Sequence, residues 1–334
     1  MPKAIDFRDA RILITGGAGF IGSNLAVRLL ELGAQVTLVD SLIPQYGGNL
    51  ANIASIRRRL DFHISDVRDP HAMRHLIQGQ DFLFNLAGQT SHLDSMQDPM
   101  TDLEINAAAQ LSILESVRKY NPNLRIVFAS TRQVYGKPAY LPVDENHSLK
   151  PVDINGIHKI AAEEYHRLYC EVYGISCTSL RLTNTYGPGM RVRDARQTFL
   201  GIWIKQVLTG ETIKVFGDGC QLRDFNFVED AVDAFIHAAQ LPEAIGRVLN
   251  LGSPEVISLM NLASLVCEVN GAGRAELVPF PADRKAIDIG DYYSDYRLAK
   301  NILNWEPRIP LREGIERTLA YYRQNAGHYW ETAA

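Results

Sequence analysis

Four glycines crowd one short stretch near the start of the chain, at Gly16, Gly17, Gly19 and Gly22, and Asp40 ends the next apolar run. A pyrophosphate needs backbone N–H groups at the start of a helix with no Cβ in the way, and glycines at this spacing meet that need. The Asp40 carboxylate can accept hydrogen bonds from both hydroxyls of an adenosine ribose, while its charge repels a 2′-phosphate. The pattern predicts a dinucleotide site that prefers NAD to NADP.

The elements around the glycines make this prediction specific, because a glycine pattern alone is weak evidence. Residues 12–14 form a short apolar run typical of a buried strand, and residues 36–39 form a second. Between them, Ile21, Leu25 and Leu29 recur at the spacing of one helix face. Strand, glycine turn, helix and strand is the order that a dinucleotide fold requires.

Strand and helix patterns continue to alternate along the chain. Further strands are expected at 60–64, 81–86, 125–129 and 175–182, and helices at 71–79, 103–120 and 156–173. This alternation predicts an α/β fold with a doubly wound parallel sheet, in which ligands bind beyond the carboxyl ends of the strands. Asp66, Gly88 and Thr131 each lie at such an end, so we expect them near the glycine turn.

Two polar residues in this region have a structural as well as a functional interpretation. Asp66 lies where the amino group of an adenine is recognised, or it caps the helix that begins at Pro70. Asn106 lies inside an expected helix and needs a buried partner. It either contributes to the cofactor site or joins its helix to a neighbouring strand.

The regular alternation ends near residue 184, and shorter, irregular elements follow. We expect a Rossmann domain at 1–183, to which 227–251 returns, and a smaller mixed lobe built from 184–226 and 252–334.

The bulk composition is that of an ordinary globular protein. The 334 residues carry a net charge of −4 with histidine neutral, and no basic stripe points to nucleic acid. We expect no signal peptide in MPKAIDFRDA, no membrane span and no metal, since the four cysteines lack ligand spacing. A cytoplasmic protein with reduced cysteines is expected.

Five segments, in order, resemble the extended short-chain dehydrogenase/reductase family, within it the nucleotide-sugar epimerases and dehydratases. The resemblance covers nearly the whole chain and implies a Rossmann fold that binds NAD and a nucleotide sugar. The segments are TGGAGFIGS at 15–23, STRQVYG at 130–136, RLTNTYGPG at 181–189, VFGDGCQLRDFNFVEDAVDAF at 215–235 and NWEPRIPLREGIERTLAYY at 304–322.

The resemblance also implies roles for single residues. Thr131 would bind the sugar hydroxyl that is oxidised, and Lys159 would hold the nicotinamide ribose and lower the local proton affinity. The implied cofactor-binding residues are Gly16, Gly19, Phe20, Ile21, Gly22, Asp40, Asp66, Val67, Leu86, Ala87, Gly88, Gln89, Asn106 and Lys159. The implied substrate-binding residues are Asn184, Thr198, Phe199, Arg223 and Arg284.

The arginines suit this assignment on chemical grounds, because a guanidinium makes a bidentate contact with phosphate. The alternative for Arg223 is a salt bridge with Asp224 or Asp230. Thr198 and Phe199 open a helix that lines the nucleotide base in the family.

One residue departs from the family. In the family, a tyrosine four residues before the lysine serves as the acid/base. In this chain the position four residues before Lys159 holds Asn155. The carboxamide of asparagine cannot exchange a proton near neutral pH. Another group then serves as the base, or Lys159 and Thr131 suffice for slow catalysis, or the protein binds without turnover. A natural divergent branch is favoured over an engineered Tyr→Asn variant. The substitute bases considered are His158, Tyr135, Tyr186 and a water on Lys159.

Arg132 and Gln133 bear on the choice of reaction. The 4,6-dehydratases of the family carry Asp-Glu at these two positions, and neither Arg132 nor Gln133 does that acid/base work. Epimerisation of a nucleotide sugar is therefore expected. C4 is the commonest site and UDP the commonest nucleotide, with C2 inversion and a uronate substrate, bound by Arg132 or Arg191, left open.

The helices at 103–120 and 156–173 resemble the family's dimer interface, so we expect a homodimer.

Overall fold

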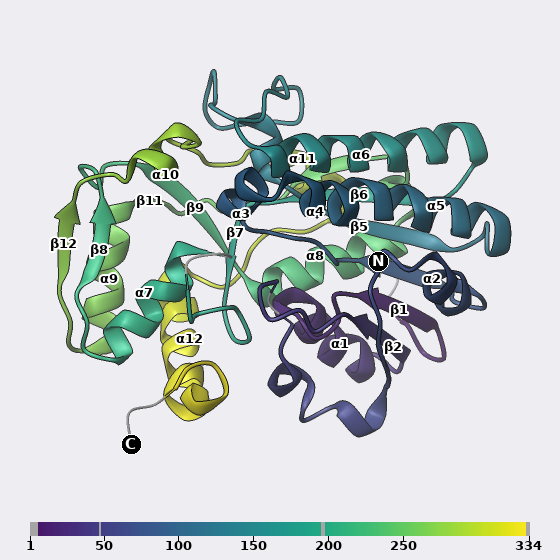
Figure 1. Cartoon of the computed structure of the whole chain (residues 1–334), viewed down its shortest axis with the longest axis horizontal. Helices are drawn as coiled ribbons and strands as arrows, with labels where there is room; N and C mark the ends of the chain where they lie inside the picture. Colours follow the sequence, from purple (N-terminus) through teal and green to yellow (C-terminus); the bar gives the residue numbers. More distant parts are fainter. Residues whose placement is uncertain (1–5, 47, 195–197, 332–334) are drawn as a thin grey trace.

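Parallel strand pairing organises the larger part of the molecule. The computed structural model of the chain describes residues 6–46, 48–194 and 198–331. Seven strands pair in the order β10-β6-β5-β4-β1-β2-β3, each pair parallel, which confirms the predicted α/β fold (Figure 1). The strands are β1 Arg11–Thr15, β2 Gln35–Asp40, β3 Asp61–Ile64, β4 Phe82–Asn85, β5 Arg125–Thr131, β6 Cys177–Leu182 and β10 Val248–Asn250.

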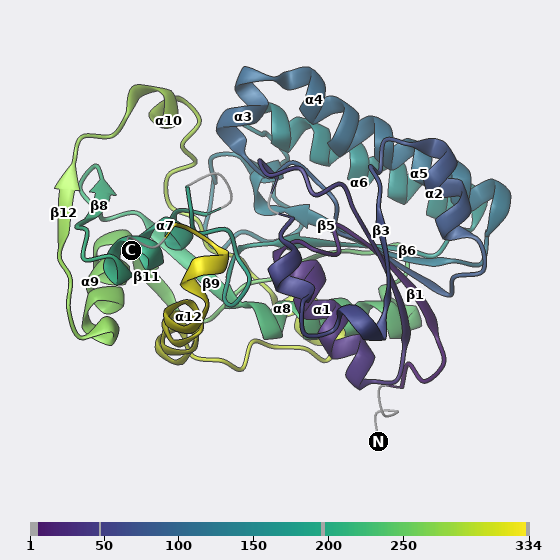
Figure 2. The ribbon, with the colours of Figure 1, turned by 60° about the horizontal axis from the view of Figure 1, so that its bottom comes forward.

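Helices cover both faces of this sheet because its strands are apolar on both sides. Ile12 and Ile14 belong to one apolar core, and Leu13, which lies between them, belongs to another. Figure 2 shows α1 and α8 on one face and α2, α5 and α6 on the other. These helices are α1 Phe20–Glu31, α2 Pro70–Ile77, α5 Ala109–Tyr120, α6 Ile154–Tyr173 and α8 Val228–Gln240.

The helix expected at 103–120 forms, but its first part is a π-helical turn and α5 begins only at Ala109. Three elements precede α5: α3 (His92–Gln97), α4 (Pro99–Leu103) and a π-helical turn (Glu104–Ala108). Pro99 starts α4, and the side chain of Asp98 caps it by accepting the Thr101 N–H. Short 3₁₀ turns lie at Leu50–Ile53, Arg57–Arg59, Arg132–Tyr135, Pro242–Ala244 and Ala326–His328.

A smaller lobe lies beside the carboxyl ends of the large sheet. It holds a three-stranded sheet in the order β11-β9-β7 and a two-stranded sheet of β12 and β8. Its strands are β7 Asn184–Tyr186, β8 Ile213–Phe216, β9 Leu222–Phe227, β11 Val256–Ser258 and β12 Ala275–Val278. The later helices are α7 Phe199–Leu208, α9 Leu259–Asn270, α10 Ala282–Ala286, α11 Arg297–Leu303 and α12 Leu311–Asn325.

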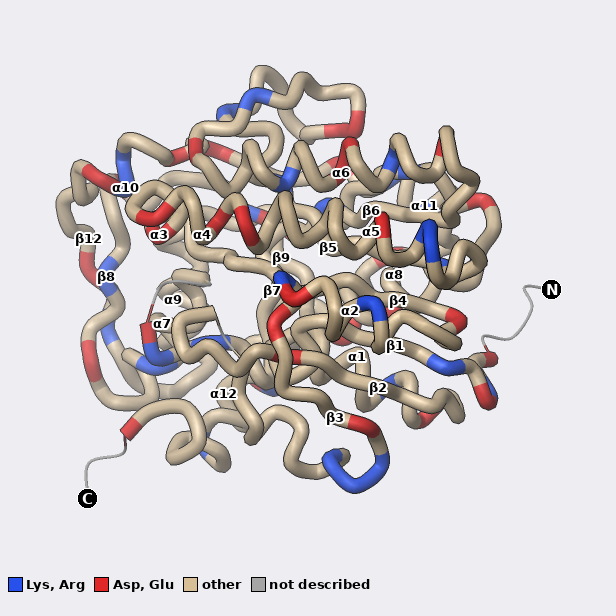
Figure 3. The backbone as a smooth tube through the Cα atoms, turned by 45° about the vertical axis from the view of Figure 1, so that its right-hand side comes forward, with Lys and Arg blue, Asp and Glu red and all other residues tan. Residues whose placement is uncertain are grey.

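One apolar core joins the two lobes. It runs from Leu25 of α1 through Phe235 of α8 to Trp203 of α7 and Ile315 of α12. Charges of both signs are interspersed along the backbone, as Figure 3 shows. In the ranges that the structure describes, no helix has the length and apolar character needed to span a membrane.

Candidate active site

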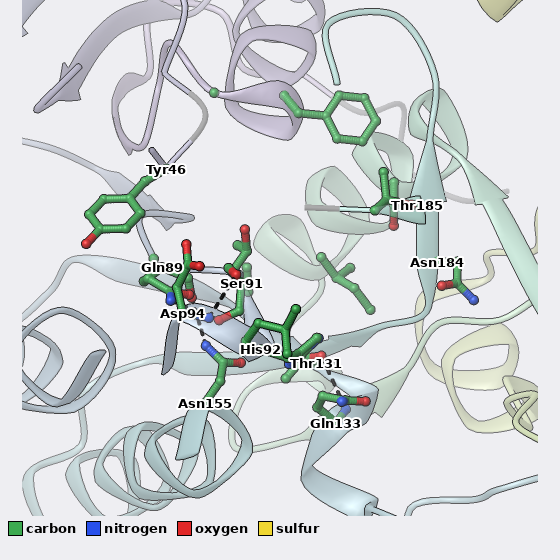
Figure 4. Close-up of a pocket in the computed structure, with 18 of the residues that line it drawn as sticks. Tyr46, Gln89, Ser91, His92, Asp94, Thr131, Gln133, Asn155, Asn184 and Thr185 are labelled. Carbon is green, nitrogen blue, oxygen red and sulfur yellow. Dashed lines mark hydrogen bonds between the residues drawn. The ribbon is translucent and has the colours of Figure 1, made fainter. Parts of the chain in front are cut away.

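A cavity of about 900 Å³ lies at the carboxyl ends of the large sheet and extends to the smaller lobe. Residues at or just after the ends of β1 to β6 line it. Figure 4 shows part of this lining, with Gln89, Thr131 and Asn155 among the labelled residues. The sequence-predicted residues that line it are Gly16, Gly19, Phe20, Ile21, Gly22, Asp40, Asp66, Val67, Leu86, Ala87, Gly88, Gln89, Thr131, Asn155, Lys159, Asn184, Thr198, Phe199, Arg223 and Arg284. Asn106 and His158 are not part of its lining.

The glycine turn forms a cradle that has no space for side chains. Gly16 has φ +67°, and a Cβ on Gly22 would lie 2.3 Å from the Gly16 carbonyl oxygen. Asp40 is fixed against this turn, because its carboxylate accepts the N–H groups of Ala18 (3.1 Å) and Leu42 (2.9 Å). Burial raises the pKa of Asp40, although these backbone donors oppose the shift.

Asp66 lines the cavity but does not cap α2, so that interpretation of Asp66 is wrong. Asp69 caps the helix by accepting the N–H groups of His71 (2.9 Å) and Ala72 (3.3 Å). Asp66 instead pairs with Arg68, whose Nη2 lies 2.8 Å from Asp66 Oδ2. The cap lies immediately before the proline, as is common for a helix that has Pro at its first position.

Asn155 is held in one orientation at the edge of the cavity. Its Nδ2 donates to the Gln89 carbonyl oxygen (2.8 Å) and to Asp102 Oδ2 (3.1 Å). Both partners are acceptors, so the amide nitrogen must face them and the amide oxygen takes the other side. In this orientation Asn155 can accept a hydrogen bond from a bound hydroxyl, but it cannot take up its proton.

Asp102 is the centre of this polar cluster, and sequence reasoning missed it. The carboxylate is fully buried, and Asn106 Nδ2 donates to its Oδ2 (3.0 Å) and to the Gln89 carbonyl (2.9 Å). His158 Nδ1 lies 2.7 Å from Asp102 Oδ1, outside the cavity lining. Asn106 therefore joins its helix to the loop after β4. The spacing of four residues between Asp102 and Asn106 was the signal available in the sequence.

Lys159 reaches the ends of β4 and β5. Its Nζ donates to the Ala129 carbonyl (3.1 Å) and lies 4.8 Å from the centre of the Phe128 ring. A Cβ on Gly88 would lie 2.9 Å from Asn106 Oδ1 and 3.2 Å from that Nζ, so the backbone at Gly88 packs closely against both side chains. Burial lowers the pKa of Lys159 to about 8, against the attraction of the Asp102 and Glu163 carboxylates.

The two tyrosines considered as substitute bases are both bound elsewhere. The Tyr135 hydroxyl donates to Asn250 Oδ1 (2.6 Å) and accepts from Arg181 Nη1 (2.7 Å), and burial raises its pKa to about 12. The Tyr186 hydroxyl donates to the Leu311 carbonyl (3.2 Å). Neither residue lines the cavity.

The start of α3 supplies lining residues that the sequence pattern did not single out. Ser91 caps this helix by accepting the Asp94 N–H (3.1 Å), and Ser91, His92 and Asp94 all line the cavity (Figure 4).

Arg223 is not paired with the acids first considered. Its Nη1 donates to the Leu222 carbonyl (2.8 Å) and to that of Gly290, and its Nη2 lies 3.8 Å from Asp288 Oδ1. The Asp224 carboxylate accepts from Thr183, Ser253 and Ser294, and the Asp230 carboxylate accepts the N–H groups of Arg308 and Ile309. The alternative interpretation of Arg223, a salt bridge with either of these acids, is therefore wrong. Burial lowers the pKa of Arg223 to about 10.

Arg132 is a second cation in the lining, half-buried and next to Thr131. Its Nη2 donates to Asn184 Oδ1 (3.0 Å), and its guanidinium lies 5.2 Å from the centre of the Tyr292 ring. Its Nη1 is buried without a hydrogen-bond partner. Burial lowers the pKa of Arg132.

The other predicted substrate residues belong to the smaller-lobe side of the cavity. Thr198 caps α7 by accepting the Leu200 N–H (3.3 Å), and Phe199 packs edge-on against Trp203. The Arg284 guanidinium lies 5.5 Å from the centre of the Phe216 ring. Aromatic rings and a cation thus lie together at this end.

A parallel sheet whose first turn is a glycine cradle, followed by an acid at the end of β2, defines a dinucleotide-binding enzyme fold. The chain belongs to the NAD dependent epimerase/dehydratase family, whose model matches residues 12–252. NAD is its cofactor. The cradle fits this group, because Gly16, Gly19 and Gly22 line the cavity at the start of α1, where no side chain from these positions stands between the backbone and a pyrophosphate.

Similar proteins agree with the resemblance seen in the sequence. UDP-glucuronic acid decarboxylase 1 of Xenopus tropicalis is 32% identical over 330 residues, which are 95% of this chain and 73% of that protein. UDP-glucose 4-epimerase of Mycolicibacterium smegmatis is 30% identical over 320 residues, 95% of this chain and 99% of that protein. The structure of UDP-glucose 4-epimerase from Thermotoga maritima with UDP-glucose superimposes with a TM-score of 0.87 at 30% identity, covering 95% and 99% of the two chains.

Proposed function

We propose that the protein is an NAD-dependent nucleotide-sugar epimerase that inverts C4 of a UDP-sugar. The observation that carries the proposal is that Thr131, Lys159 and the glycine cradle line the same cavity. The 4-epimerases among its relatives support the choice of carbon and nucleotide.

Arg132 and Gln133 argue against dehydration. Elimination of water across C5 and C6 needs an acid and a base beside the catalytic threonine. Arg132 donates to Asn184, and Gln133 Nε2 donates to Asp153 Oδ2 (2.9 Å). A guanidinium and a carboxamide cannot exchange protons at neutral pH.

The proposed mechanism oxidises the sugar carbon and reduces it again from the opposite face. When bound, NAD accepts the hydride and later returns it. Thr131 and the amide oxygen of Asn155 orient the hydroxyl at the reacting carbon. Protonated Lys159 stabilises negative charge that develops on the hydroxyl oxygen as its proton leaves. Arg223 and Arg284 neutralise the phosphates.

One observation favours a second candidate, a uronate nucleotide sugar. The buried Arg132 Nη1 has no partner beside Thr131, and an unpaired buried donor is costly. A carboxylate at C6 of the sugar would satisfy it. A relative that is named for UDP-glucuronic acid supports this alternative.

We also propose a cytoplasmic homodimer joined through α5 and α6. Leu168, Val172 and Tyr173 leave apolar surface exposed on α6, and Tyr120 does so at the end of α5. A partner copy would cover this surface. Sedimentation equilibrium should give twice the chain mass, and a monomer would contradict this part of the proposal.

The test of the function is direct. Purified protein with NAD is incubated with UDP-glucose, UDP-N-acetylglucosamine and UDP-glucuronic acid, and inversion at C4 and C2 is followed by NMR. We expect C4 inversion of one of these sugars. Tight binding of NAD and a nucleotide sugar with no turnover of any of them would refute the epimerase and favour a binding protein.

A further inference from the structure

His92 occupies a position in the cavity that suits a proton-transfer group. It is the first residue of α3 and lines the cavity together with Asn155 and Thr131 (Figure 4). Its Nδ1 lies 3.0 Å from Asp153 Oδ2, and that carboxylate is fully buried while the imidazole is 36% exposed. The imidazole therefore has a buried acid on one side and open space on the other.

Short contacts tie the His92 segment to the two segments that carry the expected chemistry. Ser95 Oγ donates to the His92 carbonyl (2.7 Å) and accepts the Asn155 N–H (3.2 Å). Asp153 Oδ2, which faces His92, also accepts from Gln133 Nε2, and the Gln133 N–H donates to Thr131 Oγ1 (3.2 Å). The imidazole is thus positioned relative to both Asn155 and Thr131.

Asp153 selects the tautomer of His92. A carboxylate beside Nδ1 favours the proton on that nitrogen, which leaves the Nε2 lone pair available as an acceptor. His92 Nδ1 and Asp153 Oδ2 lie within ion-pair distance but without hydrogen-bond geometry. Carboxylate and imidazole in this order are a general way to build a base that later acts as an acid.

We propose that His92 is the acid/base of the reaction, in the place of the tyrosine that Asn155 replaces. The inference rests on the proposed epimerase function. The hydroxyl O–H bond breaks and its proton moves to His92 Nε2, the C–H bond breaks as hydride leaves for NAD⁺, and the carbonyl forms. On return the ketone takes hydride on its other face and the proton comes back from Nε2, so no further reactant is consumed.

The alternatives are less well placed. His158, Tyr135 and Tyr186 do not line the cavity, and Lys159 already donates to the Ala129 carbonyl. Elements packed around His92 also present other groups that can affect its titration. They are Asp94 on α3, Asp98 before α4, Asp102 on α4, Arg132 after β5, Asp153 before α6, and His158 and Lys159 on α6.

The first test is His92→Gln, with His75→Gln on exposed α2 as the matched control. We expect kcat to fall about 10²- to 10⁴-fold, the usual contribution of a general base. The KM for the nucleotide sugar and the Kd for NAD should stay within about twofold, because His92 acts on the proton. The acidic limb of the wild-type pH profile of kcat should disappear in His92→Gln and persist in His75→Gln.

The second test adds the family's own base. In the double variant His92→Gln/Asn155→Tyr, the new tyrosine four residues before Lys159 serves as the acid/base in place of His92. We expect its kcat to be at least tenfold higher than that of His92→Gln. A structural role for His92 would give no such rescue. If the wild type is active and His92→Gln keeps full activity, the inference about His92 is wrong while the proposed function stands. The same holds if His92→Gln loses activity and the added Asn155→Tyr does not restore kcat. An inactive wild type would overturn the proposed function and this inference together.

Discussion

Replacing Lys159 by methionine should stabilise the protein in the absence of its cofactor, even though the lysine is central to the proposed chemistry. Its ammonium is buried, with a hydrogen bond to the Ala129 carbonyl and a ring contact to Phe128. Burial lowers the pKa of Lys159 from its usual 10.5 to about 8, which means that the charged form is disfavoured in the folded state. A site that keeps a charge there gives up stability for function.

The size of the effect follows from that pKa. One pKa unit corresponds to about 1.36 kcal/mol, so charging Lys159 costs the folded state about 3 kcal/mol at neutral pH. Methionine has a similar length and no charge, but it loses the hydrogen bond to Ala129, which contributes about 1 kcal/mol. We therefore expect Lys159→Met to be more stable by about 2 kcal/mol at pH 7, with turnover abolished.

The pH dependence gives the sharper test. Between pH 8 and 10.5 the unfolded chain holds a proton at residue 159 that the folded chain has lost, so wild-type stability rises with pH relative to the variant. Below pH 8 the difference is constant. Urea unfolding at pH 7 and pH 10 should show the advantage of Lys159→Met shrinking to zero or reversing. Exposed Lys137→Met is the control. An unchanged advantage at pH 10, or a less stable variant at pH 7, would refute the reasoning.

Three further substitutions test the cradle, the polar cluster and the core. Gly22→Ala should weaken NAD binding at least a hundredfold, measured by calorimetry, because its Cβ would lie 2.3 Å from the Gly16 carbonyl oxygen; binding within threefold of wild type would contradict the cradle. Asn155→Asp places an acceptor against Asp102 Oδ2 and the Gln89 carbonyl, so urea unfolding should show a loss of about 2 kcal/mol at pH 7. Glu163→Gln breaks a buried ion pair with Arg181 and should cost about 3–5 kcal/mol by the same assay, whereas a loss under 1 kcal/mol would show that the pair is dispensable.

The predictable part of the fold is the part with strong local patterns. Residues 12–14 are all apolar and residues 36–39 are apolar except for Thr37, and β1 and β2 form there because strands covered on both faces are mostly apolar. The carboxyl ends of parallel strands then meet at one edge, which is why residues as distant as Gly16 and Thr131 were expected together. The cavity holds both.

The residues that sequence reasoning missed are placed by tertiary packing. His92 and Asp102 belong to short helices, α3 and α4, which have too few turns to show a periodic pattern. The Asp102 side chain contacts Asn155 of α6, and the His92 side chain contacts Asp153 immediately before α6, so each contact joins segments about 50 to 60 residues apart. Asn155 was recognised as unusual, but its orientation depends on Asp102, so the sequence alone left its role open.

The apolar core shared by the two lobes has a consequence for how the molecule melts and moves. Leu25, Phe235, Trp203 and Ile315 belong to one continuous cluster, so neither lobe buries its own interior without the other. A fragment cut at residue 183 would expose that surface to water and would tend to aggregate. The intact chain should unfold in one cooperative step, and ligand entry should rely on local movement of the loops around the cavity, with the lobes keeping their relative positions.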